Sequence, residues 1–183
     1  MNFKKQFKSF TVFLLIVTAI VLLSKSSNAQ NWVSQNSGTT NTLHAVWFTD
    51  NLKGFTVGDL GTIRYTTNGG AAWLAINGVT NEDLHDVAFV SASTGIIVGD
   101  NGRVYRTTNG GTTWVQQTSG ITNNLRTVSF GANNMVYAAG VDGVIIRSTN
   151  GGVSWSSVTP GSTRFRGSSA AGSKVWLVGD GGV

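Results

Sequence analysis

A repeat of 41 residues constrains the fold of this chain more than any other feature. Trp32, Trp73, Trp114 and Trp155 follow one another at this spacing, and two further series keep it: Leu43, Leu84 and Leu125, and Asn68, Asn109 and Asn150. A fixed period of this length is the signature of an array of supersecondary units. Residues that recur in every unit serve the unit itself. Function therefore has to be sought where the units differ, or on the surface that they form together.

The chain contains three full units and the start of a fourth, which we place at residues 43–83, 84–124, 125–164 and 165–183. Each unit divides into four short segments rich in β-branched and aromatic residues. Gly, Asn and Asp separate these segments, which is the composition of strands joined by tight turns. Four strands in about 40 residues, repeated, are typical of the blades of a β-propeller. The sequence therefore predicts an all-β fold, a β-propeller of four-stranded blades.

Each predicted strand has its own pattern. The first reads L-x-x-V-x-F, the second ends in V-G-D or A-A-G, and the third reads G-x-(I/V)-x-x-(T/S). We expect the fourth strand to begin at the repeated Trp.

The turn between the third and fourth strands carries the sharpest motif, (S/T)-x-N-x-G-x-x-W. Its three copies are Thr66, Asn68, Gly70, Trp73; Thr107, Asn109, Gly111, Trp114; and Ser148, Asn150, Gly152, Trp155. Asn and Ser/Thr side chains bond backbone groups close by in sequence. Glycine permits a positive φ, and the Trp then covers the turn. We interpret all twelve residues as structural.

The two ends of the repeat array suggest an incomplete propeller. Trp32 lies in N-W-V-S-Q, which resembles a fourth strand without the three that should precede it. A propeller commonly closes by lending a terminal strand to another blade, which removes sheet edges. Residues 31–36 are predicted to be that lent strand. The fourth unit stops before its third strand, so we expect a fragment of a longer reading frame.

Residues 1–29 have the pattern of a secretory signal peptide. Lys4, Lys5 and Lys8 precede the uncharged stretch Phe10–Leu23, and small residues follow up to Ala29, after which we place the cleavage site. The alternative is an uncleaved membrane anchor, but fourteen residues rise only ~21 Å as a helix, short of a hydrocarbon core of about 30 Å. We expect export to the periplasm, the cell surface or the exterior, with membrane contact only through an uncleaved leader.

Charge and cysteine content exclude some functions. Four of the thirteen basic residues precede Ala29, which leaves nine against eight acidic residues. Such a balance lacks the basic footprint of a nucleic-acid-binding protein. Cysteine is absent, so the sheets must be held by their cores and strand pairing. We predict no cofactor and no metal, and the sequence does not specify an oligomeric state.

Four basic residues share one position near the start of the first strand of each unit: His44, His85, Arg126 and Arg166. In a propeller this position lies near the central channel. Together these side chains are candidates for contact with an acidic peptide tail or a carboxylate. Solvated strand ends are the alternative. Two histidines are too few for a structural zinc site.

The acidic residues do not suggest catalysis. Asp59, Asp100 and Asp180 occupy one repeated place in the turn after the second strand, where they favour turn formation, and the only glutamate is Glu82. A glycosidase with paired carboxylates needs two acids that face one cleft. The chain also lacks a nucleophile elbow, a phosphate-binding loop and a Cys/His cluster. We therefore predict no catalytic residues and no enzyme activity.

The turn motif resembles the Asp-box, or BNR, repeat of sialidases and related propellers, with Asn in place of Asp. The longer pattern V-G-x-x-G-x-I-x-x-T-x-N-G-G-x-x-W resembles the repeats of the photosystem II stability/assembly factor family over nearly all of residues 31–183. That resemblance implies an exported, non-enzymatic, typically seven-bladed scaffold that binds a protein or peptide on a propeller face.

Three further arginines become candidates through this resemblance. An arginine patch on one face would suit partner binding, because planar guanidinium groups capture carboxylates. Arg106 and Arg147 match each other in the repeat, and Arg64 lies one residue earlier in its unit. The alternative role is to keep a strand edge soluble. The alternative function is that of a glycan-active or glycan-binding propeller of the sialidase or xyloglucan-hydrolase kind, with its catalytic residues in missing blades.

Overall fold

The computed structural model describes residues 33–158 and 161–182. The chain divides into two units, Met1–Ser34 and Gln35–Val183, and the described secondary structure lies in the second. The predicted signal peptide, Asn31 and Trp32 lie outside the described residues. Residues 33–36 form no strand, and the closing role of residues 31–36 stays a prediction.

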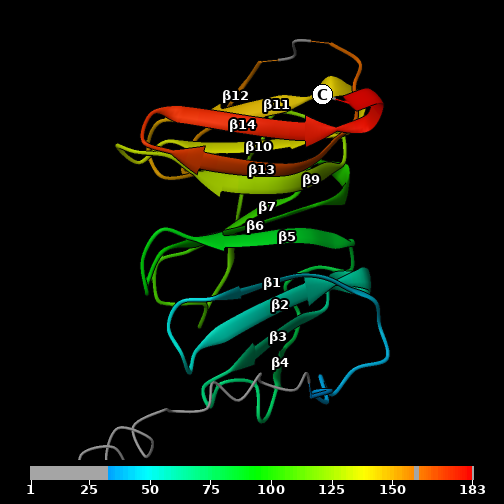
Figure 1. The fold of residues 1–183 in the computed structure, drawn as a ribbon, viewed down its shortest axis with the longest axis vertical. Coiled ribbons are helices and arrows are strands. Elements are labelled where there is room, and N and C mark those ends of the chain that lie inside the picture. Colours follow the sequence, from blue (N-terminus) through cyan, green and yellow to red (C-terminus); the bar gives the residue numbers. More distant parts are fainter. Residues whose placement is uncertain (1–32, 159–160, 183) are drawn as a thin grey trace, which may run out of the picture. The chain divides into compact units, whose positions relative to one another are not determined.

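Residues 43–157 form three four-stranded antiparallel sheets in which the strands follow their order in the sequence (Figure 1). The first sheet consists of β1 (Leu43–Phe48), β2 (Gly54–Gly58), β3 (Ile63–Thr66) and β4 (Leu74–Ile76). The second consists of β5 (Leu84–Phe89), β6 (Gly95–Gly99), β7 (Val104–Thr107) and β8 (Val115–Gln117). The third consists of β9 (Leu125–Phe130), β10 (Val136–Gly140), β11 (Ile145–Ser148) and β12 (Ser156–Ser157).

A fourth, two-stranded sheet pairs β13 (Phe165–Ala171) with β14 (Lys174–Gly179). Short 3-10 turns follow the second strand of each sheet: η1 (Asp59–Gly61), η2 (Asp100–Gly102), η3 (Val141–Gly143) and η4 (Asp180–Gly182). The predicted fold class, an incomplete β-propeller with four-stranded blades, is confirmed. One detail was wrong: each fourth strand begins one residue after its Trp, because the Trp belongs to the turn.

The first strands of successive blades lie beside one another, so β5 packs against both β1 and β9, and β9 against β13. Strand alternation then sends neighbouring side chains of one strand into two different cores. Ile97 of β6 faces the first blade, whereas Ile96 and Val98 face the third. The blades are therefore held together by apolar layers between sheets.

Two such layers are buried. The layer between the first and second blades contains Phe55, Val57, Ile63, Leu84, Val87, Phe89, Ile97, Tyr105 and Trp114. The layer between the second and third blades contains Ala88, Ile96, Val98, Val104, Leu125, Val128, Val136, Ala138, Val144 and Ile146.

The Asp-box turn is held by its own polar side chains. In the second blade, Thr107 Oγ1 accepts hydrogen bonds from the backbone N–H of Gly111 at 2.9 Å and of Asn109 at 3.3 Å. Asn109 Oδ1 accepts from Thr113 N at 3.0 Å. Gly111 has φ +81°, and a Cβ there would lie 2.4 Å from the Phe55 ring of the first blade. The glycine therefore serves both the turn and the close packing of two blades.

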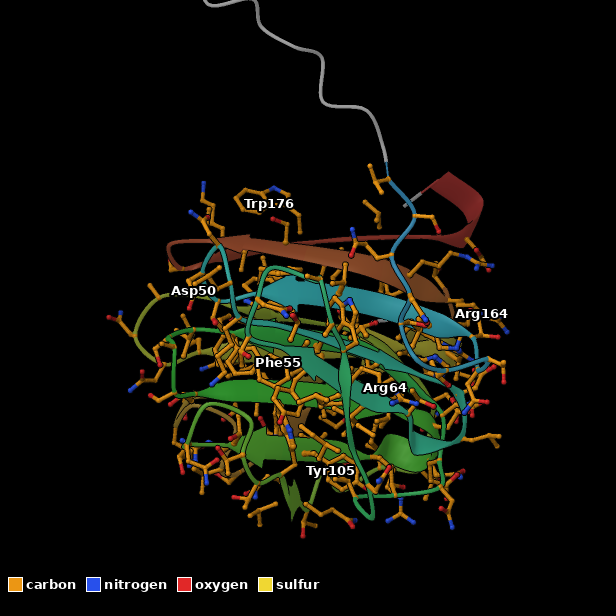
Figure 2. All side chains as sticks on the ribbon, turned by 90° about the horizontal axis from the view of Figure 1, so that it is seen from below. Asp50, Phe55, Arg64, Tyr105, Arg164 and Trp176 are labelled. Carbon is orange, nitrogen blue, oxygen red and sulfur yellow. The ribbon has the colours of Figure 1, made fainter. Side chains whose placement is uncertain are left out.

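Each blade has two distinct ends, which we call the box end and the bulge end. At the box end, the Asp-box turns meet the hairpins between first and second strands through backbone bonds of 2.8 Å, such as Gly110 N to Ser93 O. At the bulge end, the 3-10 turns bond the linkers between blades, as Asp100 N does to Asp83 O at 2.9 Å. Figure 2 shows Asp50 at the box end and Arg164 at the bulge end. Among the described residues, we find no helix with the length and apolar character required to span a membrane.

Candidate functional site

The first strand of every blade carries a β-bulge at the same place. Leu43 pairs with Gly58 and Ala45 with Val57, so His44 is the extra residue, and the other blades repeat this shift. The extra residues are His44, His85, Arg126 and Arg166, which we call the bulge row. Bulges redirect side chains and are frequent beside functional sites. The structure thus brings these four predicted residues to one end of adjacent inner strands.

In three blades the bulge-row residue meets an aspartate of its own 3-10 turn. His44 Nε2 lies 2.6 Å from Asp59 Oδ1, and His85 Nε2 lies 2.6 Å from Asp100 Oδ1. Arg166 donates to both carboxylate oxygens of its blade's turn aspartate, Asp180. The hydrogen bond from His44 lowers the pKa of Asp59, and the hydrogen bond from Arg166 lowers that of Asp180.

The third blade breaks this pattern, because Val141 stands where the other blades have Asp. Its acid, Asp142, is shifted by one residue into the left-handed position (φ 56°) and accepts a bond from Asn123 instead. Arg126 therefore turns to the neighbouring blade. Its Nη1 lies 3.0 Å from Nδ1 and 2.8 Å from Nε2 of His85, and its Nη2 lies 3.8 Å from Asp100.

The buried His85 is held between an acid and a cation. Donation from Nε2–H to Asp100 leaves Nδ1 as the acceptor for Arg126, which requires a neutral imidazole. Burial lowers the pKa of His85, and the hydrogen bond to Asp100 opposes this while the nearby charge of Arg126 adds to it. The two arginines and two histidines of the row face three turn aspartates. The turn acids therefore offset the positive charge that the sequence suggested for this surface.

The repeat patterns of the sequence did not single out one polar residue of this region, Asp86 on β5. Its Oδ2 accepts from Val128 N at 2.8 Å and from Thr127 Oγ1 at 3.1 Å, and Thr127 Oγ1 lies 2.7 Å from Ser168 Oγ. This chain of bonds crosses from the second blade to the fourth. Burial raises the pKa of Asp86, although bonds from Val128, Val87 and Thr127 counteract it. The sequence does contain one signal that points to Asp86: it is an acidic residue at a strand position that Ala45 occupies in the first unit.

The three other candidate arginines do not form one patch. Arg64 lies one position earlier on its strand than Arg106 does, and its Nη2 donates to Gly38 O at 2.6 Å. Arg106 lies at the box end, where its Nε donates to Gly151 O of the next blade's Asp-box at 2.7 Å. Arg147 occupies the equivalent place on β11 and is exposed. Only Arg106 and Arg147 therefore share a location.

Every acidic residue of the chain has a structural partner. Besides Asp59, Asp86, Asp100, Asp142 and Asp180, these are Asp50 with Leu52 N, Asp83 with Leu60 N, and Glu82 with Asn101 and Arg103. Together they make up all eight acids in the sequence. Within residues 33–158 and 161–182, no three His, Cys, Asp or Glu side chains are grouped so that they would hold a metal. The carboxylates join turns, strands and blades.

The box end also contains a groove of about 470 Å³ between the first two blades. Its lining includes Lys53, Tyr65, Ile76, Gly110 and Thr112. No pattern in the sequence predicts this groove, because it depends on how one blade's turn meets the next blade.

Comparisons with known proteins agree with this architecture. A comparison with curated proteins gave no match. Among solved structures, YCF48 bound to a D1 peptide has a TM-score of 0.65 at 24% identity, over 74% of this chain and 48% of that one. YCF48 from Cyanidioschyzon merolae has a TM-score of 0.65 at 19% identity, over 76% and 50%. An ancestral GH74 enzyme has a TM-score of 0.57 at 25% identity, over 67% and 19%.

The chain thus spans half or less of the length of these structures. The family model described as photosynthesis system II assembly factor YCF48 matches residues 71–171, which is more than half of the 183 residues. The resemblance inferred from the repeat is confirmed, and the chain belongs to the photosystem II assembly factor YCF48 family.

Proposed function

We propose that this chain is a non-enzymatic protein-binding scaffold whose box end recognises an acidic segment of its partner. The observation that carries this proposal is the separation of charge between the two ends of the blades. Lys53, Arg106, Arg147 and Lys174 lie at the box end with a single acid, Asp50. The other seven acids lie toward the bulge end. A surface with one sign of charge attracts a partner of the opposite sign and orients it.

A peptide partner is supported by the family relationship and by the solved complex of YCF48 with a D1 peptide. Blades packed through two apolar layers provide a rigid support for such contacts, which keeps the entropy cost of binding small. The non-enzymatic part of the proposal is supported by the carboxylates, all of which form hydrogen bonds or ion pairs within the fold.

The test is a titration with a D1 peptide by calorimetry at low and at moderate salt. Because the proposed attraction is between exposed charges, we expect binding that weakens as the ionic strength rises. Binding that is insensitive to salt, or no binding at low salt, would contradict recognition by the basic box end.

A second candidate function is suggested by the GH74 enzyme, which is 25% identical over 67% of this chain. Under this alternative the propeller acts on or binds glycans. Incubation with xyloglucan, followed by analysis of reducing ends and of oligosaccharide products, separates the two. Release of oligosaccharide products that persists after contaminating glycosidases have been removed from the preparation would favour the glycan-active function.

Export through the predicted signal peptide is part of the proposal, with a destination in the periplasm, at the cell surface or outside the cell. Mass spectrometry of the protein produced in a bacterial host with an export pathway tests it. We expect a mature chain that begins at Gln30. A chain that retains Met1 in the cytoplasm would contradict it.

A further inference from the structure

The groove between the first two blades differs from its counterpart between the second and third blades. At the second junction, Arg106 extends over the next blade and donates from Nε to Gly151 O at 2.7 Å. At the first junction the residue equivalent to Arg106 is Tyr65, and the turn residue equivalent to Gly151 is Gly110. Tyr65 makes no hydrogen bond to that turn, and both line the same groove. A groove of about 470 Å³ stands where Arg106 lies in the other junction.

The walls of this groove combine aromatic surface with a cation. Phe55 forms the floor, is 1% exposed, and stacks with Tyr65 at a centroid distance of 6.4 Å. Lys53 Nζ lies 5.7 Å from the centroid of the Phe55 ring. The groove therefore offers the partly exposed ring of Tyr65 to an apolar side chain and, at one edge, an ammonium group.

The ammonium group of Lys53 forms no ion pair within the described part of the chain. No carboxylate there lies within 4.0 Å of it. Asp50, the nearest acid in the sequence, accepts hydrogen bonds from the backbone N–H groups of Leu52 and Lys53. Lys53 thus remains available for an external carboxylate.

We propose that this groove is a specificity pocket for an acidic residue that is adjacent to an aromatic residue in a partner peptide. The partner's ring packs against Tyr65, and its carboxylate binds Lys53 Nζ. The volume is in the range of small-ligand pockets and holds two side chains. The inference rests on the proposed function, because it assigns one pocket within the basic box end.

A glycan suits this groove less well. Sugar hydroxyls are best held by planar amide and carboxylate groups, which bond several of them at once. The lining contains no Asn, Gln, Asp or Glu. A neutral glucan also leaves the charge of Lys53 without a counterpart.

Tyr65→Arg is the sharpest variant, because it copies the residue that covers the second junction. We expect it to fold, since Arg106 occupies the same place in the next blade, and to weaken peptide binding about tenfold or more by filling the groove. Lys53→Met keeps the aliphatic stem and removes the charge, with an expected loss of about fivefold. Arg164→Met is the control, because Arg164 is exposed at the bulge end, and it should leave pocket binding unchanged.

The measurement is a nuclear magnetic resonance titration of the ¹⁵N-labelled protein. The probes are two capped tetrapeptides, Ser-Phe-Glu-Ser and Ser-Phe-Gln-Ser, and a xyloglucan heptasaccharide. We expect the Glu peptide to shift the amides of Gly110, Gly111 and Thr112 in the wild type, the Gln peptide to bind more weakly, and Tyr65→Arg to lose these shifts. Arg106→Tyr opens the second junction and should add shifts at Gly151 and Gly152.

Three results would overturn the assignment. Shifts of the Glu peptide confined to residues around Arg147 would leave the basic box end as the binding surface but exclude the groove. Shifts at Gly110 with the heptasaccharide alone would make the pocket a glycan site. The absence of shifts with every probe at millimolar concentration would exclude the pocket, while the calorimetric titration with the D1 peptide judges the scaffold separately.

Discussion

Trp114 shows how a turn residue becomes part of the core. Its side chain is 9% exposed and packs edge-on against Phe55 and Phe89 at centroid distances of 6.2 and 5.8 Å. Trp114→Ala is expected to lower the free energy of unfolding by about 3–5 kcal/mol, because a large buried ring is replaced by a cavity. Chemical denaturation measures this. Trp73→Ala is the matched control, since Trp73 is only half-buried, and should cost less.

A loss below about 1 kcal/mol for Trp114→Ala would mean that the ring is not part of the core. A larger loss for Trp73 than for Trp114 would contradict the burial of the two rings.

Asp86 is expected to show an unusual pH dependence. Burial raises its pKa in the folded state, so the folded protein holds this proton at a pH where the unfolded chain has lost it. Its contribution to stability therefore grows as the pH falls through the folded pKa and levels off below about 3.8. The difference in unfolding free energy between the wild type and Asp86→Asn should shift in favour of the wild type between pH 7 and pH 4.

Taking the difference in unfolding free energy between the wild type and Asp86→Asn at each pH removes the effect of His85, because both proteins contain that residue. Its lowered pKa makes both proteins lose stability as the pH falls below about 6.5, and this common change cancels. A difference that stays constant with pH, or that moves in the opposite direction, would contradict the burial of Asp86.

At the scale of the element, the Asp-box depends on one hydroxyl. Thr107→Val leaves the buried N–H of Gly111 and the N–H of Asn109 without their acceptor. We expect a loss of about 1–3 kcal/mol in unfolding free energy. Thr107→Ser keeps the hydroxyl, as Ser148 does in the third blade, and should retain most of the stability. A larger loss for Thr107→Ser than for Thr107→Val would show that the methyl group, and not the hydroxyl, holds the turn.

The bulge of the third blade offers a test of the pairing in the other blades. Val141→Asp places a carboxylate where the other blades have one, so Arg126 is expected to leave His85 and bind it. Because the charge of Arg126 contributes to the lowered pKa of His85, that pKa should rise. Titration of the imidazole proton signals measures it. An unchanged pKa of His85 would show that Arg126 keeps its place beside the ring.

The sequence predicted the elements well and their contacts poorly. The 41-residue repeat predicted four-stranded antiparallel sheets, because each strand pattern and each turn recurs at the same interval. The partner of Arg106 was not predictable, because it lies 45 residues away in the next blade. Asp59 and Asp100 were assigned to turns from their Gly-Asp-x-Gly context. Their hydrogen bonds to His44 and His85 depend on the β-bulge in the first strand of each blade, which no sequence pattern predicts.

At the scale of the whole molecule, the two equivalent arginines of the box end should differ in stability. Arg106→Ala removes a hydrogen bond between blades and is expected to cost about 0.5–1.5 kcal/mol in unfolding free energy. Arg147→Ala changes an exposed side chain and should be close to neutral. Thermal and chemical unfolding check both. A cost for Arg147→Ala as large as that for Arg106→Ala would contradict this distinction. The double variant is expected to weaken partner binding.

The central claim is that the box end, and not the bulge end, binds an acidic partner. The most direct measurement compares the affinity of Arg147→Glu and Arg164→Glu for the same D1 peptide, since both arginines are exposed and lie at opposite ends. We predict that Arg147→Glu weakens binding at low salt, whereas Arg164→Glu leaves it unchanged. Weakening by Arg164→Glu alone would place the partner at the bulge end and contradict the account.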